Sequence, residues 1–181
     1  MSFSLDTKSW AQQQFSSCEL GDRRRTKRLI EVAEQVANNP SGSFPKQMNV
    51  WSNVKAAYRL FATDDVTFRA VAEPHWKQTR QCKPGRYLVL GDTTELDFGY
   101  QREIAGLAPV GPGNGRGFLL HNGILVDAEN KAVLGVAGQT IHYRQPAPKK
   151  ESQAKRFKRE RESKVWGDVI DQIGPPQKGV Q

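Results

Sequence analysis

The chain has 181 residues, and its 27 lysines and arginines against 19 aspartates and glutamates give a net charge of +8 and an isoelectric point of about 9.7. It has no run of eighteen apolar residues and no basic-then-apolar start, so we expect a cytoplasmic protein without membrane contact. Cys18 and Cys82 lie in no metal-ligand spacing. The basic charge favours a polyanionic partner, most often nucleic acid, with a merely basic protein as the alternative.

The first part of the chain has the periodicity of amphipathic helices. Apolar residues recur on one helix face across residues 29–37. Asp22 precedes this stripe as a good N-cap, and Asn-Asn-Pro-Ser-Gly at 38–42 is a strong stop. We therefore expect four helices, over residues 9–17, 23–37, 53–61 and 67–81, the last kinked or restarted at Pro74. In the third helix, Ala57, Tyr58 and Phe61 are expected to face a core.

The pattern changes to strands after Lys-Pro-Gly at 83–85. We expect strands at 87–98, 118–126 and 132–143, a hairpin turn at 127–131 and an amphipathic helix at 165–173. The glycine-rich segment 111–117 precedes a strand rather than a helix, so it is interpreted as a loop and not as a phosphate-binding loop. The fold class is therefore α+β, with a helical domain at residues 1–84 and a second domain at residues 85–181.

Five cations crowd the first two turns of the second helix. The candidate DNA-binding residues are Arg23, Arg24, Arg25, Thr26, Lys27 and Arg28. Cations are unfavourable at the positive end of a helix dipole, whereas free amides and side-chain cations together suit a phosphate. We therefore expect this helix start to bind the DNA backbone, with a solvated charged face as the alternative. A second basic run, at 149–164, is expected to be a solvated helix, with a DNA-facing surface as the alternative.

One carboxylate stands in the middle of the first expected strand. Asp92 lies in the apolar stretch LVLGDTTELDF, where burial of an ionised carboxylate is costly unless it is paired. A structural role is one interpretation. A catalytic, metal-binding role is the other, because three strands and a helix match the start of ribonuclease H-like folds, in which a carboxylate on the first, central strand holds catalytic metal ions. We expect Asp92 to be buried at a cost in stability.

Several motifs resemble those of one enzyme family. The segment LGDRRRTKRL (20–29) resembles the Leu-Gly-Asp-x-Arg-Arg-Thr-x-Arg-Leu motif of bacterial cut-and-paste transposases, in the insertion-sequence group that includes the enzyme of the kanamycin-resistance transposon. AAYRLFATDDVT (56–67) is similar to the next helix and turn of that family, LGDTTELDFGY (90–100) to the strand with its first catalytic aspartate, and GRGFLLHNGILVD (115–127) to the strand after it. The resemblance covers nearly the whole chain.

The resemblance implies a helical domain that grips double-stranded DNA at transposon ends, followed by a ribonuclease H-like domain. It implies phosphoryl transfer by three acids around two Mg²⁺ ions. Asp92 matches the first acid, and Arg24, Arg25, Thr26 and Arg28 match the basic helix. For assembly, a homodimer and a heterodimer with an intact transposase both stay open.

The family pattern is incomplete in this sequence. The second acid is expected on a strand that begins just after Gln181, and the third, near a Tyr-Arg-Glu signature, is also absent. We therefore expect the N-terminal part of a transposase, with an incomplete ribonuclease H-like domain and too few acids to hold Mg²⁺ stably or to cut DNA alone. The alternative is a non-enzymatic DNA-binding protein that inhibits or represses transposition.

Overall fold

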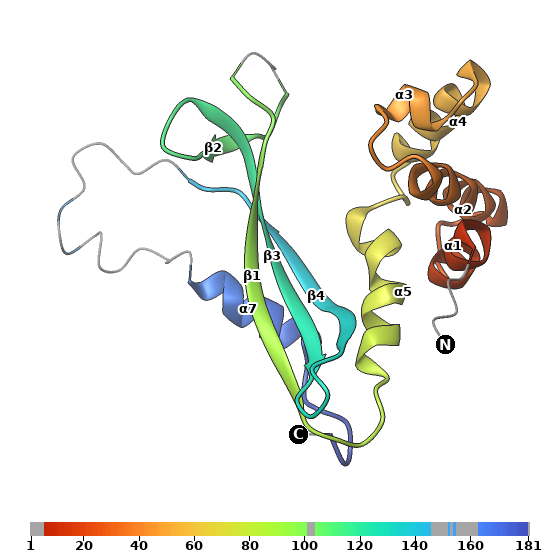
Figure 1. The fold of residues 1–181 in the computed structure, drawn as a ribbon. Helices are drawn as coiled ribbons and strands as arrows, with labels where there is room; N and C mark the ends of the chain where they lie inside the picture. Colours follow the sequence, from red (N-terminus) through yellow and green to blue (C-terminus); the bar gives the residue numbers. More distant parts are fainter. Residues whose placement is uncertain (1–5, 101–103, 146–151, 153, 155–162, 181) are drawn as a thin grey trace. The chain divides into compact units, whose positions relative to one another are not determined.

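The chain divides into a helical unit and a unit built on a β-sheet. The computed structural model describes residues 6–100, 104–145, 152, 154 and 163–180 (Figure 1). By their contacts, the two units are Met1–Gln78 and Thr79–Gln181. None of the helices in the described ranges has the length and apolarity needed to cross a bilayer.

The helical unit contains the four expected helices, except for the last two residues of α5, and one short helix that the sequence did not indicate. The helices are α1 (Thr7–Phe15), α2 (Arg23–Asn38), α3 (Phe44–Gln47), α4 (Trp51–Phe61) and α5 (Phe68–Arg80). Asp22 caps α2 as expected, since its side chain accepts a hydrogen bond from the Arg24 amide at 2.8 Å. The fourth expected helix corresponds to α5. It does not restart at Pro74, because Pro74 lies inside it.

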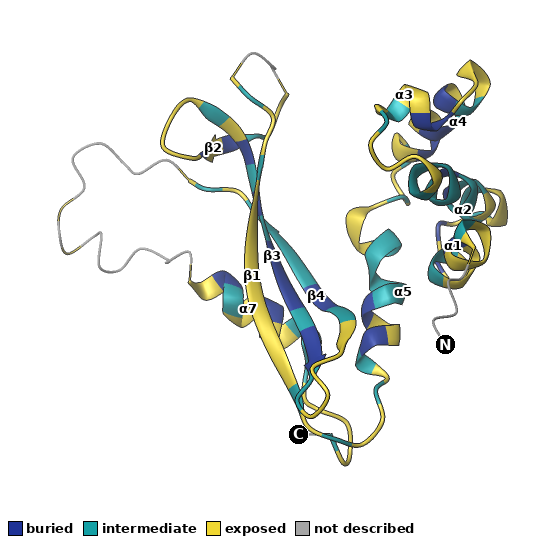
Figure 2. Cartoon of the chain, viewed as in Figure 1, coloured by how far each residue is buried: buried dark blue, intermediate teal, exposed yellow. Residues whose placement is uncertain are grey.

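The core of the helical unit forms where α2 packs against α4. Leu29, near the start of α2, shares a buried cluster with Leu60, near the end of α4. Val32, one turn further along α2, shares a second cluster with Val54 and Ala57. The two helices therefore run in opposite directions, and the start of α2 lies beside the end of α4. The buried residues of α4 recur every third position, which leaves its other side outside this core (Figure 2).

One expectation about α4 was wrong. Ala57 is fully buried, but Tyr58 and Phe61 are 54% and 47% exposed. The positions that face α2 are Val54, Ala57 and Leu60, and helical geometry then turns position 58 about 100° away from that contact.

The second unit is an antiparallel sheet with one helix against it. Its elements are β1 (Tyr87–Asp97), β2 (Ala108–Val110), β3 (Gly115–Asp127), β4 (Val133–His142) and α7 (Lys164–Ile173). β3 is central, with β1 on one side and both β2 and β4 on the other. The three expected strands and the last helix are present. β2 was not expected, and residues 115–117, interpreted from the sequence as loop, begin β3.

A row of glycines lets α7 approach the sheet closely. Gly91, Gly123 and Gly138 are register partners across β1, β3 and β4. A Cβ atom built on Gly91 would lie 2.8 Å from the ring of Trp166, and one on Gly123 would lie 2.8 Å from Cδ1 of Ile173. Both distances are shorter than real Cβ atoms show, so Trp166 or Ile173 of α7 would have to shift if either glycine carried a side chain.

The expectation that Asp92 is buried on a central strand was wrong. β1 pairs with β3 alone among the strands of the described residues, so it lies at an edge of the sheet. Figure 2 shows β1 as exposed beside the buried β3, and Asp92 is exposed with it. Burial of a strand depends on its neighbours, which the apolar pattern of one segment does not reveal. The expected cost of burying this carboxylate therefore has no basis in the fold.

The glycine row gives a first prediction. Gly123→Ala should lower the free energy of unfolding of the second unit by about 1–3 kcal/mol, because the new methyl group overpacks the contact with α7. Gly167→Ala is the matched control inside α7, where an added Cβ meets no atom within 4 Å, and it should stabilise by about 0.5–1 kcal/mol. Hydrogen exchange of the β3 amides measures both changes. Equal effects of the two substitutions would contradict this account of the α7 seat.

Candidate nucleic-acid interface

The start of α2 is held by the aspartate that caps it. Nη2 of Arg24 donates to Oδ2 of Asp22 at 2.7 Å, and the Arg24 amide donates to Oδ1. The side-chain hydrogen bond of Arg24, followed by its amide, lowers the pKa of Asp22 to about 2. Because the folded pKa is depressed, the stability that this carboxylate contributes is present above its ordinary pKa of 3.8 and is lost as the pH falls toward 2.

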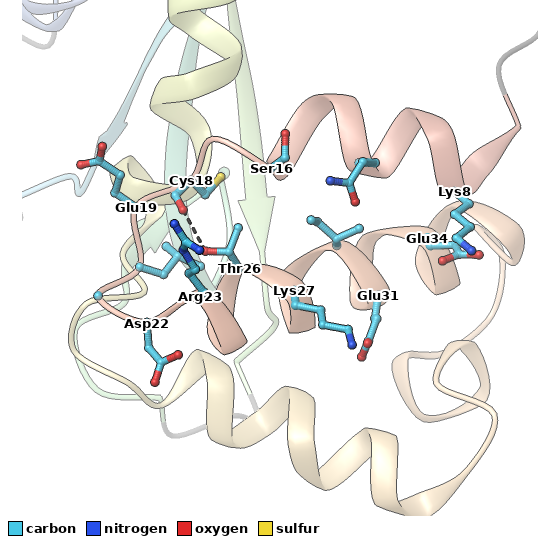
Figure 3. A pocket seen from close by; sticks show the side chains of 14 residues that line it. Lys8, Ser16, Cys18, Glu19, Asp22, Arg23, Thr26, Lys27, Glu31 and Glu34 are labelled. Carbon is cyan, nitrogen blue, oxygen red and sulfur yellow. Dashed lines mark hydrogen bonds between the residues drawn. The ribbon is translucent and has the colours of Figure 1, made fainter.

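Two residues of the candidate set bind within the protein. Nη1 of Arg25 donates to the carbonyl oxygen of Leu20 at 2.8 Å and pairs with Oδ2 of Asp65 at 2.5 Å. The hydroxyl of Thr26 donates to the carbonyl oxygen of Cys18 at 2.9 Å (Figure 3). These contacts fasten both the α1–α2 connection and the turn after α4 to the first turn of α2. Arg25 and Thr26 therefore hold α2 in position within the helical unit.

The other four residues of the set are cations with more open surroundings. Arg23, Arg24 and Lys27 are exposed, and the side chain of Arg24 is 91% accessible. Arg28 is 37% accessible and pairs with Glu31 at 2.8 Å. The fold therefore divides the sequence cluster. Arg25 and Thr26 bind residues outside α2, Arg24 and Arg28 pair with the neighbouring acids Asp22 and Glu31, and Arg23 and Lys27 are exposed.

The groove between α1 and α2 has a mixed electrostatic character. Its lining includes Lys8, Arg23 and Lys27, but also Glu19, Asp22, Glu31 and Glu34, as Figure 3 shows. Alternating charges of both signs do not attract a polyanion as a continuous basic surface does. The groove itself is thus a poor candidate for the path of a DNA backbone.

The outer face of α4 carries the features that sequence reasoning missed. Trp51, Lys55, Tyr58 and Arg59 recur at i, i+4, i+7 and i+8, so they share one side of the helix. Trp51 is 65% exposed, and Nζ of Lys55 lies 5.7 Å from the centre of its ring. The signal was present in the sequence as an amphipathic pattern with the aromatic residues on the polar side. Exposed aromatic rings among cations suit nucleic acid, because cations bind phosphates while rings make apolar contacts.

Asp92 stands apart from other metal-ligating side chains. Its Oδ2 accepts a hydrogen bond from the hydroxyl of Thr94 at 3.2 Å. Glu95 and Asp97 follow on β1 but alternate to the opposite face, where Glu95 pairs with Arg144 at 3.6 Å. Within the described ranges, no three or more His, Cys, Asp or Glu side chains gather closely enough to hold a metal ion. The described residues therefore do not form a two-metal site by themselves.

Most of the basic run at 149–164, including residues 149–151, 153 and 155–162, lies outside the described residues.

Comparison with known families identifies the helical region. Residues 7–66 match the family model described as "Transposase DNA-binding". The match spans α1 to α4 and includes both the cation cluster of α2 and the aromatic and basic face of α4. The region thus has a transposase-related DNA-binding role, and DNA is its partner.

The geometry predicts different consequences for two neighbouring arginines. Arg25→Ala should lower the free energy of unfolding of the helical unit by about 1–2 kcal/mol, because it leaves the Leu20 carbonyl and Asp65 without their donor. Arg24→Ala removes the same charge from an exposed side chain and should leave stability close to that of the parent chain. Hydrogen exchange of the α2 amides distinguishes the two. A loss of equal size in both variants would refute the structural role of Arg25.

Proposed function

We propose that this chain belongs to the insertion-sequence transposases named above and binds the ends of its transposon as double-stranded DNA. The observation that carries the proposal is the family match over residues 7–66, a region whose surface presents exposed cations and aromatic rings. Two of the motifs that carry the resemblance to that group coincide with the matched region: 20–29 lies inside it, and 56–67 overlaps it up to residue 66.

The DNA surface of this proposal combines the start of α2 with the outer face of α4. Since the two helices pack in opposite directions, Arg24 and Arg28 lie at the end of the pair where Arg59 also lies. These cations would bind phosphates and set the register of the protein on the duplex. Trp51 and Lys55 lie one to two turns away along α4 and would contact the groove or its edge. Arg25 and Thr26 would act by holding α2 in place.

The second unit is proposed to be part of a ribonuclease H-like domain. Besides the strand order, a parallel contact supports this: Gly85, just before β1, bridges to Val180, and its amide donates to the carbonyl oxygen of Gly179 at 2.9 Å. A strand that continued this pairing would run parallel to β1 along its open edge and pass Asp92. Asp92 is then the first of several acids that together bind Mg²⁺ for phosphoryl transfer. Among the described residues, no group of three or more metal-ligating side chains gathers to hold a metal ion, so no catalytic step is assigned to them.

The alternative function is inhibition or repression of transposition by DNA binding alone. Within the described residues, Asp92 is exposed and no group of three metal-ligating side chains forms, which is compatible with it. A protein that occupied transposon ends without cutting them would compete with an active enzyme. Such a protein could act by itself or in a heterodimer with an intact transposase.

The salt dependence of binding tests the proposed DNA surface. If about four phosphates are neutralised, the logarithm of the association constant should fall with log salt at a slope of about −3 to −4. The double variant Arg24→Ala/Arg59→Ala should make that slope shallower by about 2, because each cation releases about one counterion. The measurement is fluorescence anisotropy with a duplex from the end of the element that encodes the chain.

The control removes the same charge elsewhere in the helical unit. Arg69→Ala/Lys77→Ala alters two exposed cations of α5, outside the matched region, and should leave the slope unchanged. The proposed surface would be wrong if both double variants reduced the slope equally, or if neither did.

The described residues contain no cluster of acids around Asp92, which gives a further prediction. Incubation of the chain with the same duplex and Mg²⁺ or Mn²⁺ should produce no nicks, because two-metal phosphoryl transfer needs more ligands than Asp92 supplies. Denaturing electrophoresis of end-labelled DNA provides the measurement. Specific nicking that disappears in Asp92→Asn would show that the chain completes a catalytic site.

A further inference from the structure

A row of polar side chains crosses the sheet on the face opposite α7. Asp92, Asn122 and Gln139 are register partners on β1, β3 and β4, and Thr94 lies two residues from Asp92 on the same face of β1. The glycines that contact α7 lie one position away along each strand. Side chains at those positions would therefore point to the other face of the sheet. The polar row is therefore separate from the packing of the helix.

Hydrogen bonds connect this row from one side to the other. Nε2 of Gln139 lies 2.6 Å from Oδ1 of Asn122, and Nδ2 of Asn122 lies 3.5 Å from the hydroxyl oxygen of Thr94 and 3.4 Å from the Leu120 carbonyl oxygen. The hydroxyl of Thr94 lies 3.2 Å from Oδ2 of Asp92. The bond between Asn122 and Thr94 is the longest of the chain and thus its weakest link.

The donors and acceptors of these groups make the hydrogen bonds of the row run in one direction. An amide nitrogen only donates, so Thr94 accepts from Asn122 through its oxygen and has its single proton left for Asp92. The amide of Asn122 is oriented in the same sense, with its oxygen toward the Gln139 donor and its nitrogen toward Thr94. Every donor in the row therefore points toward the carboxylate, which accepts without donating.

The members of the row on β3 and β4 are less exposed than those on β1. Asn122 is only 9% exposed, and Gln139 is half-buried. The backbone amide of Gln139 donates to Oε1 of Gln172 in α7 at 2.8 Å. Asp92 and Thr94, on β1, are exposed. A β-branched threonine has few χ1 rotamers, so the amide of the buried Asn122 can select one of them and thereby set the direction of the Thr94 hydroxyl.

We infer that Thr94, Asn122 and Gln139 are positioning residues, which hold the carboxylate of Asp92 in one orientation on an otherwise exposed strand. The functional meaning of this orientation rests on the proposed function, in which Asp92 binds a metal ion. A carboxylate that must share a reaction centre with acids from other segments is useful only if its direction is set in advance. The arrangement of the side chains does not itself depend on DNA or metal.

The test is the rotamer of Asp92 in the isotope-labelled full chain, without DNA or metal. Three-bond couplings from the backbone to Cγ of Asp92 report its χ1 angle by NMR. The parent chain should show one dominant rotamer. Thr94→Val keeps the shape of the side chain and removes the hydroxyl, and should give averaged couplings, while Thr94→Ser should restore the single rotamer. Asn122→Ala and Gln139→Ala should give partial averaging, although Gln139 lies two strands away from Asp92.

The control is Thr93→Val, on the same strand but the opposite face. The hydroxyl of Thr93 lies 2.9 Å from Nδ1 of His121, so this change also removes a hydrogen bond from β1. It should leave the Asp92 couplings unchanged. Averaged couplings in the parent chain, unchanged couplings in Thr94→Val, or an equal effect of Thr93→Val would each overturn the inference. The DNA-binding test uses substitutions in the helical unit, whereas this test uses substitutions in the sheet unit. A negative result in one test therefore leaves the other result unaffected.

Discussion

The concentration of positive charge at the start of α2 is the constraint on which the helical unit depends. Five cations lie where the helix dipole is already positive, so the helix needs acids close by. Asp22 caps the helix and binds Arg24, Asp65 binds Arg25, and Glu31 binds Arg28. The pair with Asp65 also ties the turn after α4 to α2. The acids that offset the charge thereby place α4, with its aromatic and basic outer face, beside the basic helix start.

The second unit depends on a different constraint, the close approach of α7 to three glycines. This contact covers one face of the sheet and leaves the polar row with Asp92 on the other. The edge of β1 is unpaired within the described residues, apart from the parallel bridge at Gly85. A sheet edge of this length normally pairs or is protected. The open edge of β1 lies beside Asp92 and leaves room there for a further strand.

The sequence predicted those features that depend on local pattern. Caps, stops and the 3.6-residue period located the helices, and strand-like runs between turn and loop signals located the three longer strands. α3 and β2, with four and three residues, are too short for either signal. The partners of Arg25 and the exposure of Asp92 could not be read in the same way. Asp65 lies forty positions from Arg25, and the burial of Asp92 depends on which strands flank β1. Tyr58 was assigned to the core by its hydrophobicity, whereas the spacing of Val54, Ala57 and Leu60 determines the buried face.

The central claim is that DNA binds the surface formed by the start of α2 and the outer face of α4. The most direct measurement is the change in amide chemical shifts when the labelled chain is titrated with a duplex from the end of its element. The account predicts the largest changes at Arg24, Trp51, Lys55 and Arg59, with small changes across the sheet unit. Changes confined to the sheet unit, or spread evenly over all exposed cations, would contradict it.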